Sequence, residues 1–444
     1  MNKETKILSG FSSYFGVINV KSTKGLEKAI KQSGWDMMAV EYSDKQRIES
    51  STLLFDNFIN SVYPPKNDKA PKDIKHFEVK LTPTATPMRV ALDAQKQTLG
   101  EEHTLNVEYI RLHTFCDEQL IFEMRVNNAE LTLETLRKQN QTIQMVNWYD
   151  ERQPSQYYDL FRPMVKIYNC LQNSDYELAD LDSIRRTFHK IFVGNKMYIY
   201  SVTNAEDDEP ANTDGNYAHD YTLWDLTYNN PIGAASDPAD HYHPDKHYYD
   251  TVMKEDSLHV YSNWAALGIL NHFCVLGQGI RDQEMGHWKE MRTMLFLNAL
   301  HVKSYLMLVN EEFREKPKEF KKLWKNFDNF DKRFNFSTAS YTYVPQMIYE
   351  TMRHSLEVRD EMKVLRERLN RTNDMVERKS DEQINWLLAC LALLGIGSAL
   401  NDITSYLKEA WEKSSLCVNL IVIAIVLGII LVGIFIYLKL GRKK

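Results

Sequence analysis

Two long apolar runs dominate the C-terminal end of the chain. Residues 383–401 and residues 414–438 contain no charged side chain. Each residue of a helix adds about 1.5 Å, so about 20 residues span the roughly 30 Å hydrocarbon core of a bilayer. The pattern predicts a transmembrane hairpin, with helices at 384–401 and 416–438 and an extracytoplasmic loop at 402–415.

The segment before this hairpin has a helical pattern. Residues 343–382 contain no Gly and are rich in Glu, Arg, Met and Leu, which favour helix. Apolar or small positions recur there at spacings of three and four, the pattern of a helix that packs on a partner helix. These positions are Met362, Leu365, Leu369, Thr372 and Val376. We expect one continuous helix that runs from this segment into the first apolar run.

A second helical block covers residues 284–325, where apolar residues lie on adjoining faces and a charged segment follows. The next segment, 327–340, places Asn and Asp between aromatic residues, which favours a turn over a third helix. Residues 284–383 are therefore predicted to form a helical stalk, with its two parts packed antiparallel.

Earlier segments have the pattern of a sheet. Residues 104–115 and 119–126 alternate apolar and polar positions on either side of a polar turn, as half-buried strands do. Residues 189–202 place two apolar runs around Gly194 and Asn195, which is typical of a tight hairpin. Helical and irregular patterns lie between these hairpins. Residues 1–283 are therefore predicted to form a mixed α/β domain, so that the whole chain is an α+β membrane protein.

One segment of this domain has the composition of a long loop. Residues 204–250 concentrate Asp, Asn, Pro, Gly, Tyr and His. Three of its histidines, His241, His243 and His247, lie among carboxylates, and these are the usual ligands of zinc and related metals. However, no motif such as HExxH is present, and a polar loop carries histidines by chance as well. A metal site and a plain polar loop both remain open.

Composition and motifs narrow the function. The net charge is −6 with both signs interspersed, so binding to DNA or RNA through a basic surface is not expected. The five cysteines form no CxxC pair, which argues against a disulfide framework or a zinc knuckle. The chain lacks GxxxxGK[ST], GxGxxG after a strand and GxSxG, so we expect no enzyme of these common kinds.

The distribution of basic residues orients the hairpin. Arg and Lys are frequent just before it and in the tail 439–444, whereas the loop between its helices is slightly acidic. Because basic residues stay on the cytoplasmic side, both chain ends are predicted to lie in the cytosol. The N-terminus has no secretory signal pattern, which agrees with a cytosolic domain. The sequence thus predicts a protein of a bacterial-type inner (plasma) membrane with two transmembrane helices.

This order of elements resembles the CorA-like family of two-helix membrane proteins, mainly over residues 284–444. The resemblance implies a homopentameric funnel whose first transmembrane helix lines the pore and whose second packs outside it. In that family a Gly-Met-Asn motif ends the pore helix. Here Asn401 matches the Asn by position, whereas Ala399 and Leu400 replace the Gly and Met. Gly395 and Ser398 are the other expected pore residues, and Asp402, Glu409 and Glu412 would gather cations in the loop.

With its altered filter and enlarged cytosolic domain, the chain is most similar to the CorA-like membrane effectors of type III CRISPR systems. This resemblance implies an antiviral ion channel, embedded in the lipid bilayer and gated by a nucleotide second messenger, either a cyclic oligoadenylate or an adenosylmethionine-AMP conjugate. One alternative is a transporter of Mg²⁺-like divalent cations. A second alternative is a membrane-anchored metal-dependent enzyme or receptor that uses the histidine-rich loop.

Overall fold

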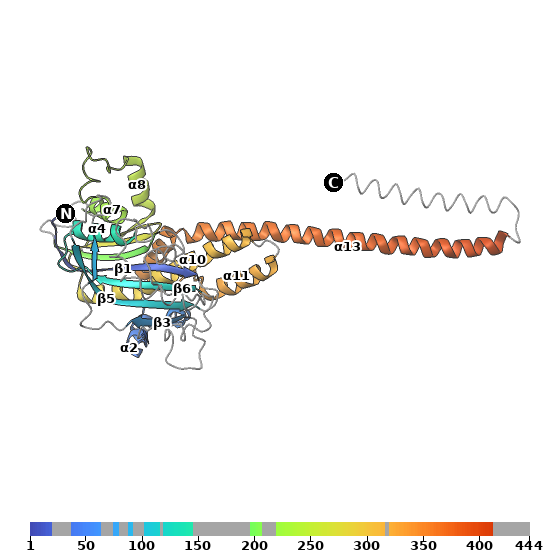
Figure 1. Ribbon diagram of the computed structural model, residues 1–444, viewed down its shortest axis with the longest axis horizontal. Coiled ribbons are helices and arrows are strands. Elements are labelled where there is room, and N and C mark those ends of the chain that lie inside the picture. Colours follow the sequence, from blue (N-terminus) through green and yellow to red (C-terminus); the bar gives the residue numbers. More distant parts are fainter. Residues whose placement is uncertain are drawn as a thin grey trace, which may run out of the picture. The chain divides into compact units, whose positions relative to one another are not determined.

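A computed structural model gives the structure of the protein. It describes residues 1–19, 37–63, 74–79, 88–91, 102–115, 119–144, 196–206, 219–315 and 319–411. The chain divides into two units, Met1–Glu367 and Arg368–Lys444. The first unit is a mixed α/β domain built around one large sheet (Figure 1).

The sheet of the first unit has ten strands and is mostly antiparallel. Nine strands follow the order β2-β3-β5-β6-β1-β7-β10-β9-β8, and β4 pairs separately with β5. Only β7 and β10 pair in parallel among the described strands. The bounds are β1 (Ile7–Asn19), β2 (Met37–Ala39), β3 (Ile74–Val79), β4 (Met88–Ala91), β5 (Glu102–Phe115), β6 (Gln119–Asn127), β7 (Tyr198–Ala205), β8 (Ser257–Tyr261), β9 (Trp264–Ile269) and β10 (His272–Gly277).

Helices cover both faces of this sheet. One face packs against α4 (Leu133–Gln144) and α7 (Asp220–Tyr228), whose leucines share a buried cluster with Leu267 and Leu276. The other face packs against the π-helix η1 (Trp288–Arg292) and α10 (Thr293–Glu315), where Phe296 contacts Phe15. The remaining helices are α2 (Asp44–Ser51), α3 (Asp56–Val62), α8 (Lys246–Glu255), α9 (Asp282–His287), α11 (Phe320–Phe334), α12 (Tyr343–Ser355) and α13 (Val358–Trp411).

The predicted mixed α/β domain and its first hairpin are confirmed. Strands β5 and β6 pair antiparallel, with Leu112 opposite Phe122, on either side of the turn expected at 116–118. Strand β7 corresponds to the second strand of the hairpin expected at 189–202, but it pairs with β1 on one edge and with β10 on the other, so neither edge is left for the expected hairpin partner. The first half of that hairpin lies outside the described residues.

The turn predicted at 327–340 is wrong as far as Phe334, because α11 extends to that residue. The aromatic residues of this segment follow helical spacing and form one buried stripe with Leu323. Within the stripe, Phe330 stacks on Tyr305 of α10 with ring centroids 3.5 Å apart. Burial of the aromatic face outweighs the local preference of Asn and Asp for a turn.

The loop predicted at 204–250 is also wrong in part, since it contains α7 and the start of α8. Helix α7 forms because Leu223, Trp224 and Leu226 bury against the sheet. Asp245 caps the start of helix α8, because its carboxylate accepts hydrogen bonds from the backbone N–H groups of His247 and Tyr248. Turns connect the two helices between these points.

The helix expected from residue 343 onward is interrupted once. Helix α12 ends at Ser355, and Glu357 then adopts φ +54°, in the left-handed region that non-glycine residues rarely occupy. Helix α13 starts at the next residue. Lys303 of α10 lies between the carboxylates of Glu357 and Glu361, at 3.4 and 3.2 Å, so α10 holds the first turn of α13.

Helix α13 includes the first apolar run and continues past Asn401 to Trp411, through most of the segment expected as a loop. Five large apolar side chains of this run are more than half exposed: Ile384, Trp386, Leu387, Leu388 and Leu391. Among the described residues, no helix meets the combined length and hydropathy that a membrane crossing requires. The second apolar run and the basic tail lie outside the described residues.

Candidate functional site

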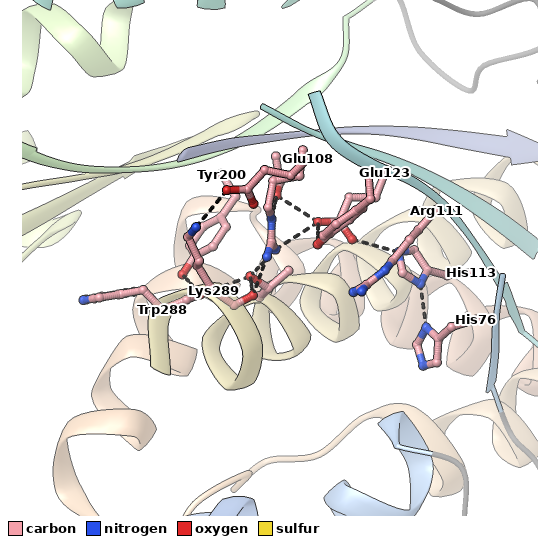
Figure 2. Close-up of polar contacts among 12 residues, drawn as sticks. His76, Glu108, Arg111, His113, Glu123, Tyr200, Trp288 and Lys289 are labelled. Atoms are coloured by element: carbon pink, nitrogen blue, oxygen red, sulfur yellow. Dashed lines mark hydrogen bonds and ion pairs between the residues drawn. The ribbon is translucent and has the colours of Figure 1, made fainter. Parts of the chain in front are cut away.

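A band of polar side chains crosses the sheet face beneath η1 and α10 (Figure 2). Directly opposite pairs in neighbouring strands build it, because alternate residues of a strand point to the same face. These pairs are His76 and His113, Glu78 and Arg111, Arg111 and Glu123, and Arg125 and Ser13. We call these residues, together with Tyr109, the polar band.

Glu123 and Arg125 form the centre of the polar band, and both are buried. Glu123 accepts hydrogen bonds from Ser13 at 2.8 Å, Tyr109 at 2.9 Å and Arg125 at 3.1 Å. Burial alone would raise the pKa of the Glu123 carboxyl, but Arg125 and His113 outweigh burial and hold this pKa well below its usual range. Glu123 is therefore a buried carboxylate whose charge Arg125 balances.

Two buried histidines extend the band from Glu123 toward the edge of the sheet. His113 Nε2 lies 3.0 Å from Glu123, the two Nδ1 atoms of His113 and His76 lie 2.6 Å apart, and His76 Nε2 lies 2.8 Å from the carbonyl oxygen of Val62. Three hydrogen bonds need three protons, whereas two neutral imidazoles carry only two. When both histidines are neutral, one of these three contacts therefore has no proton to form a hydrogen bond. The pair could bind one additional proton at that contact.

The π-helix η1 lies directly over the band and depends on it. A π-turn shifts the hydrogen-bond register of a helix, which leaves backbone carbonyls without their usual partners. Arg125 Nη1 donates to the carbonyl of Lys289 at 2.8 Å, and the Tyr200 hydroxyl donates to the carbonyl of Trp288 at 3.1 Å (Figure 2). Side chains of the sheet thus donate hydrogen bonds to two backbone carbonyls of the π-turn. Such π-turns are frequent at functional sites.

Charge is almost balanced across this region. Arg111 pairs with Glu78 at 2.8 Å, and Lys289 pairs with Glu108 at the same distance. Arg125 pairs with Glu123 at 3.1 Å. These three ion pairs are wholly or partly buried, so removal of one partner leaves the other charge without compensation.

The three histidines predicted to bind metal do not form a cluster with one another. His241, His243 and His247 are exposed, and the Nδ1 atom of His243 lies 2.7 Å from the carbonyl oxygen of Ala235. Among the described residues, no group of three or more His, Cys, Asp or Glu side chains is placed to hold a metal ion.

The predicted pore and loop residues lie on α13 or beyond it. Helix α13 contains five of them: Gly395, Ser398, Asn401, Asp402 and Glu409. Apart from the neighbouring backbone of α13, no described atom lies within 4 Å of the position that a Cβ of residue 395 would take. Glu412 lies outside the described residues.

Sequence reasoning missed the polar band. Tyr109, Arg111 and His113 alternate with Ile110 and Leu112, and this pattern predicts a half-buried strand, with one face in the core and the other in solvent. Both faces are in fact covered by helices. The available signal was the type of the polar residues, because a strand that carries Arg and His opposite Glu contains complementary charges rather than solvated ones.

We expect the first unit to lose stability as the pH falls below 6.5. Burial lowers the pKa of His76 and His113 below 6.5 and that of His272 to about 4. Above pH 6.5 such a histidine is neutral in both the folded and the unfolded chain. As the pH falls from 6.5 toward the folded pKa, only the unfolded chain binds the proton, so each such histidine lowers the free energy of unfolding by up to about 1.4 kcal/mol per pH unit. Urea unfolding followed by tryptophan fluorescence at pH 7.5 and 5.5 measures this. His76→Leu should reduce the difference, and a pH-independent midpoint would contradict the burial of neutral histidines.

No protein-family model, curated protein or solved structure matches the chain.

Proposed function

We propose that the protein is an oligomeric two-helix membrane channel whose sheet domain responds to a small ligand. In this proposal it acts as a CorA-like antiviral effector that compromises the membrane when a nucleotide second messenger binds. The main observation in support is helix α13. It starts at Val358, which is buried in the first unit, and it includes the first apolar run.

The exposed side chains of that run support a lipid or helix environment. Successive residues of a helix turn by about 100°, so Trp386 and Leu388 point to nearly opposite sides. Both are more than half exposed. An apolar surface on several sides of one helix needs cover from lipid or from other helices, since soluble proteins rarely expose such a surface.

The contact between α10 and α13 supports the proposal that a ligand bound to the sheet domain controls the position of α13. Lys303 of α10 is buried and holds Glu357 and Glu361 at the start of α13, and the preceding turn η1 rests on the polar band. A ligand that binds better to one arrangement of η1 and α10 would shift the population of α13 positions. The ligand must supply differential affinity for the two arrangements, because equal affinity shifts nothing.

Asn401→Ala tests the pore directly. In the proposed channel, Asn401 forms a ring at the end of the pore helix, so its replacement should change ion flux and cell toxicity while assembly stays intact. Flux into proteoliposomes and growth of expressing cells are the measurements. Asn385→Ala, on the same helix near the start of the run, is the matched control. Unchanged flux and toxicity in the Asn401 variant would remove this residue from the pore.

A further inference from the structure

Helices α7 and α8 meet through a group of aromatic side chains (Figure 1). Tyr221 of α7 stacks on Tyr249 of α8, with ring centroids 4.7 Å apart. Trp224 lies 5.1 Å from Tyr249 and 4.3 Å from Tyr228 between ring centroids. The hydroxyls of Tyr228 and Tyr248 are 3.2 Å apart. We call Tyr221, Tyr228, Tyr248 and Tyr249 the tyrosine surface.

Part of the tyrosine surface is open to solvent. Tyr221 is 42% exposed and Tyr248 is 52% exposed, whereas Trp224 beneath them is buried. Tyr221 and Tyr228 lie about 10 Å apart along α7, because each residue of a helix adds about 1.5 Å. Tyrosine is enriched at protein interfaces, since its ring gives a large, rigid apolar contact and its hydroxyl stays hydrated. A group of exposed tyrosines is therefore a candidate interaction surface.

The chain around the tyrosine surface is acidic. Residues 219–261 contain eight Asp and Glu residues but only two Lys residues and no Arg. Lys246 is already paired with Asp250 at 3.0 Å, and Asp237, Asp245 and Glu255 are exposed. This segment alone carries a charge of −6, as large as that of the whole chain. Nucleic acids and anionic lipids are negatively charged, so both are repelled here.

Arginine is the side chain that matches both the charge and the aromatic rings. Its planar guanidinium pairs with carboxylates and stacks on aromatic faces, whereas the lysine ammonium is a compact, strongly hydrated charge. An extended polypeptide advances about 3.3 Å per residue, so about three residues cover the 10 Å length of the surface along α7. The surface therefore suits a short arginine-rich segment.

We propose that the tyrosine surface is a docking site for an arginine-rich segment of a partner protein. Guanidinium groups of the partner stack on Tyr221 and Tyr248. Asp245 and Glu255, at the two ends of α8, pair with further basic side chains of the same segment. Docking does not depend on the proposed channel, because the tyrosine surface includes no residue of α13 or of the polar band.

The test uses the full-length chain in nonionic detergent micelles and a short fluorescent peptide in which Arg and Ser alternate. Fluorescence anisotropy should show binding that weakens as the salt concentration rises. The same peptide with Lys in place of Arg should bind less tightly, because it keeps the charge but loses the planar stacking. The version with Glu should not bind. Failure of the Arg peptide to bind at low salt, or equal binding of the Arg and Lys peptides, would overturn the proposal.

Variants locate the binding on the molecule. Tyr221→Ala combined with Tyr248→Ala should weaken binding of the Arg peptide about tenfold, because two exposed cation–π contacts are lost. Tyr341→Ala combined with Tyr343→Ala removes two exposed tyrosines elsewhere and should bind as the wild type does. Equal binding by the two double variants would place the peptide at another surface. Native mass spectrometry should show an unchanged number of copies for the Tyr221 and Tyr248 variant; a smaller number would assign the surface to a contact between copies.

A second pair of variants tests the charge without removing any aromatic ring. Asp245→Asn combined with Glu255→Gln removes two negative charges and retains the cap of α8, because Asn caps a helix as well as Asp does. It should weaken binding and reduce its salt dependence. Glu49→Gln combined with Glu311→Gln, two exposed glutamates outside this segment, is the matched control. An equal effect of both charge variants would show attraction to the net charge alone and would overturn the docking site.

Discussion

Replacing Arg125 with methionine is expected to lower the free energy of unfolding by about 3–5 kcal/mol, the cost of breaking a buried ion pair from one side. Arg125 donates to Glu123, to Ser13 and to the backbone carbonyl of Lys289. Without it, the Glu123 charge is buried with no cation in contact, and the Lys289 carbonyl in η1 loses one of its two side-chain donors, the other being the Thr293 hydroxyl at 2.9 Å. Urea unfolding of the full-length protein in micelles, followed by tryptophan fluorescence, measures the loss.

Two further variants show whether the ion pair is the cause. Glu123→Leu combined with Arg125→Met should be less destabilised than Arg125→Met alone, because no unpaired charge remains. Arg111→Met should cost less than Arg125→Met, since the Glu78 partner of Arg111 is partly exposed. A loss below about 1 kcal/mol for Arg125→Met would contradict a buried, unhydrated Glu123.

Leu391→Arg is expected to keep the first apolar run out of the bilayer. An arginine near the centre of a transmembrane helix costs about 3 kcal/mol on insertion scales, and this run is the less apolar of the two. The second run should still insert, so one crossing replaces two and the C-terminal tail moves to the opposite side of the membrane. Protease access to a C-terminal tag in spheroplasts reports this change.

Val364→Arg is the matched control for this change of topology. Val364 is an exposed apolar residue of the same helix α13 but lies in the first unit. Its replacement adds the same charge outside the apolar run and should leave the tag protected. A tag that stays protected in Leu391→Arg as well would exclude the predicted hairpin.

Sequence patterns predicted the elements whose apolar residues recur at one spacing. Apolar and polar residues alternate along β5 and β6, although β6 is buried on both faces, and α10 carries apolar residues on adjoining helical faces. The same reasoning failed where tertiary burial decides the outcome. Phe327, Phe330 and Phe334 form a helix because α10 offers an aromatic surface, and α7 forms because the sheet covers its leucines.

The polar band could be predicted only in part. Alternation placed Arg111 and His113 on one face of β5, but nothing in a single strand shows that a helix covers this face. The contact between His76 and His113 requires the register of β3 on β5, and the π-turn at η1 leaves no pattern in the sequence. The local sequence therefore does not show which strands pair over long range or which helices cover the sheet.

The central claim is that the apolar helices of several copies surround a shared axis in the membrane. Native mass spectrometry of the full-length chain, extracted directly into lipid nanodiscs, measures the number of copies in one assembly. The account predicts a closed oligomer, with five copies expected from the resemblance. A single copy in each nanodisc would contradict it, because one two-helix chain cannot enclose a pore.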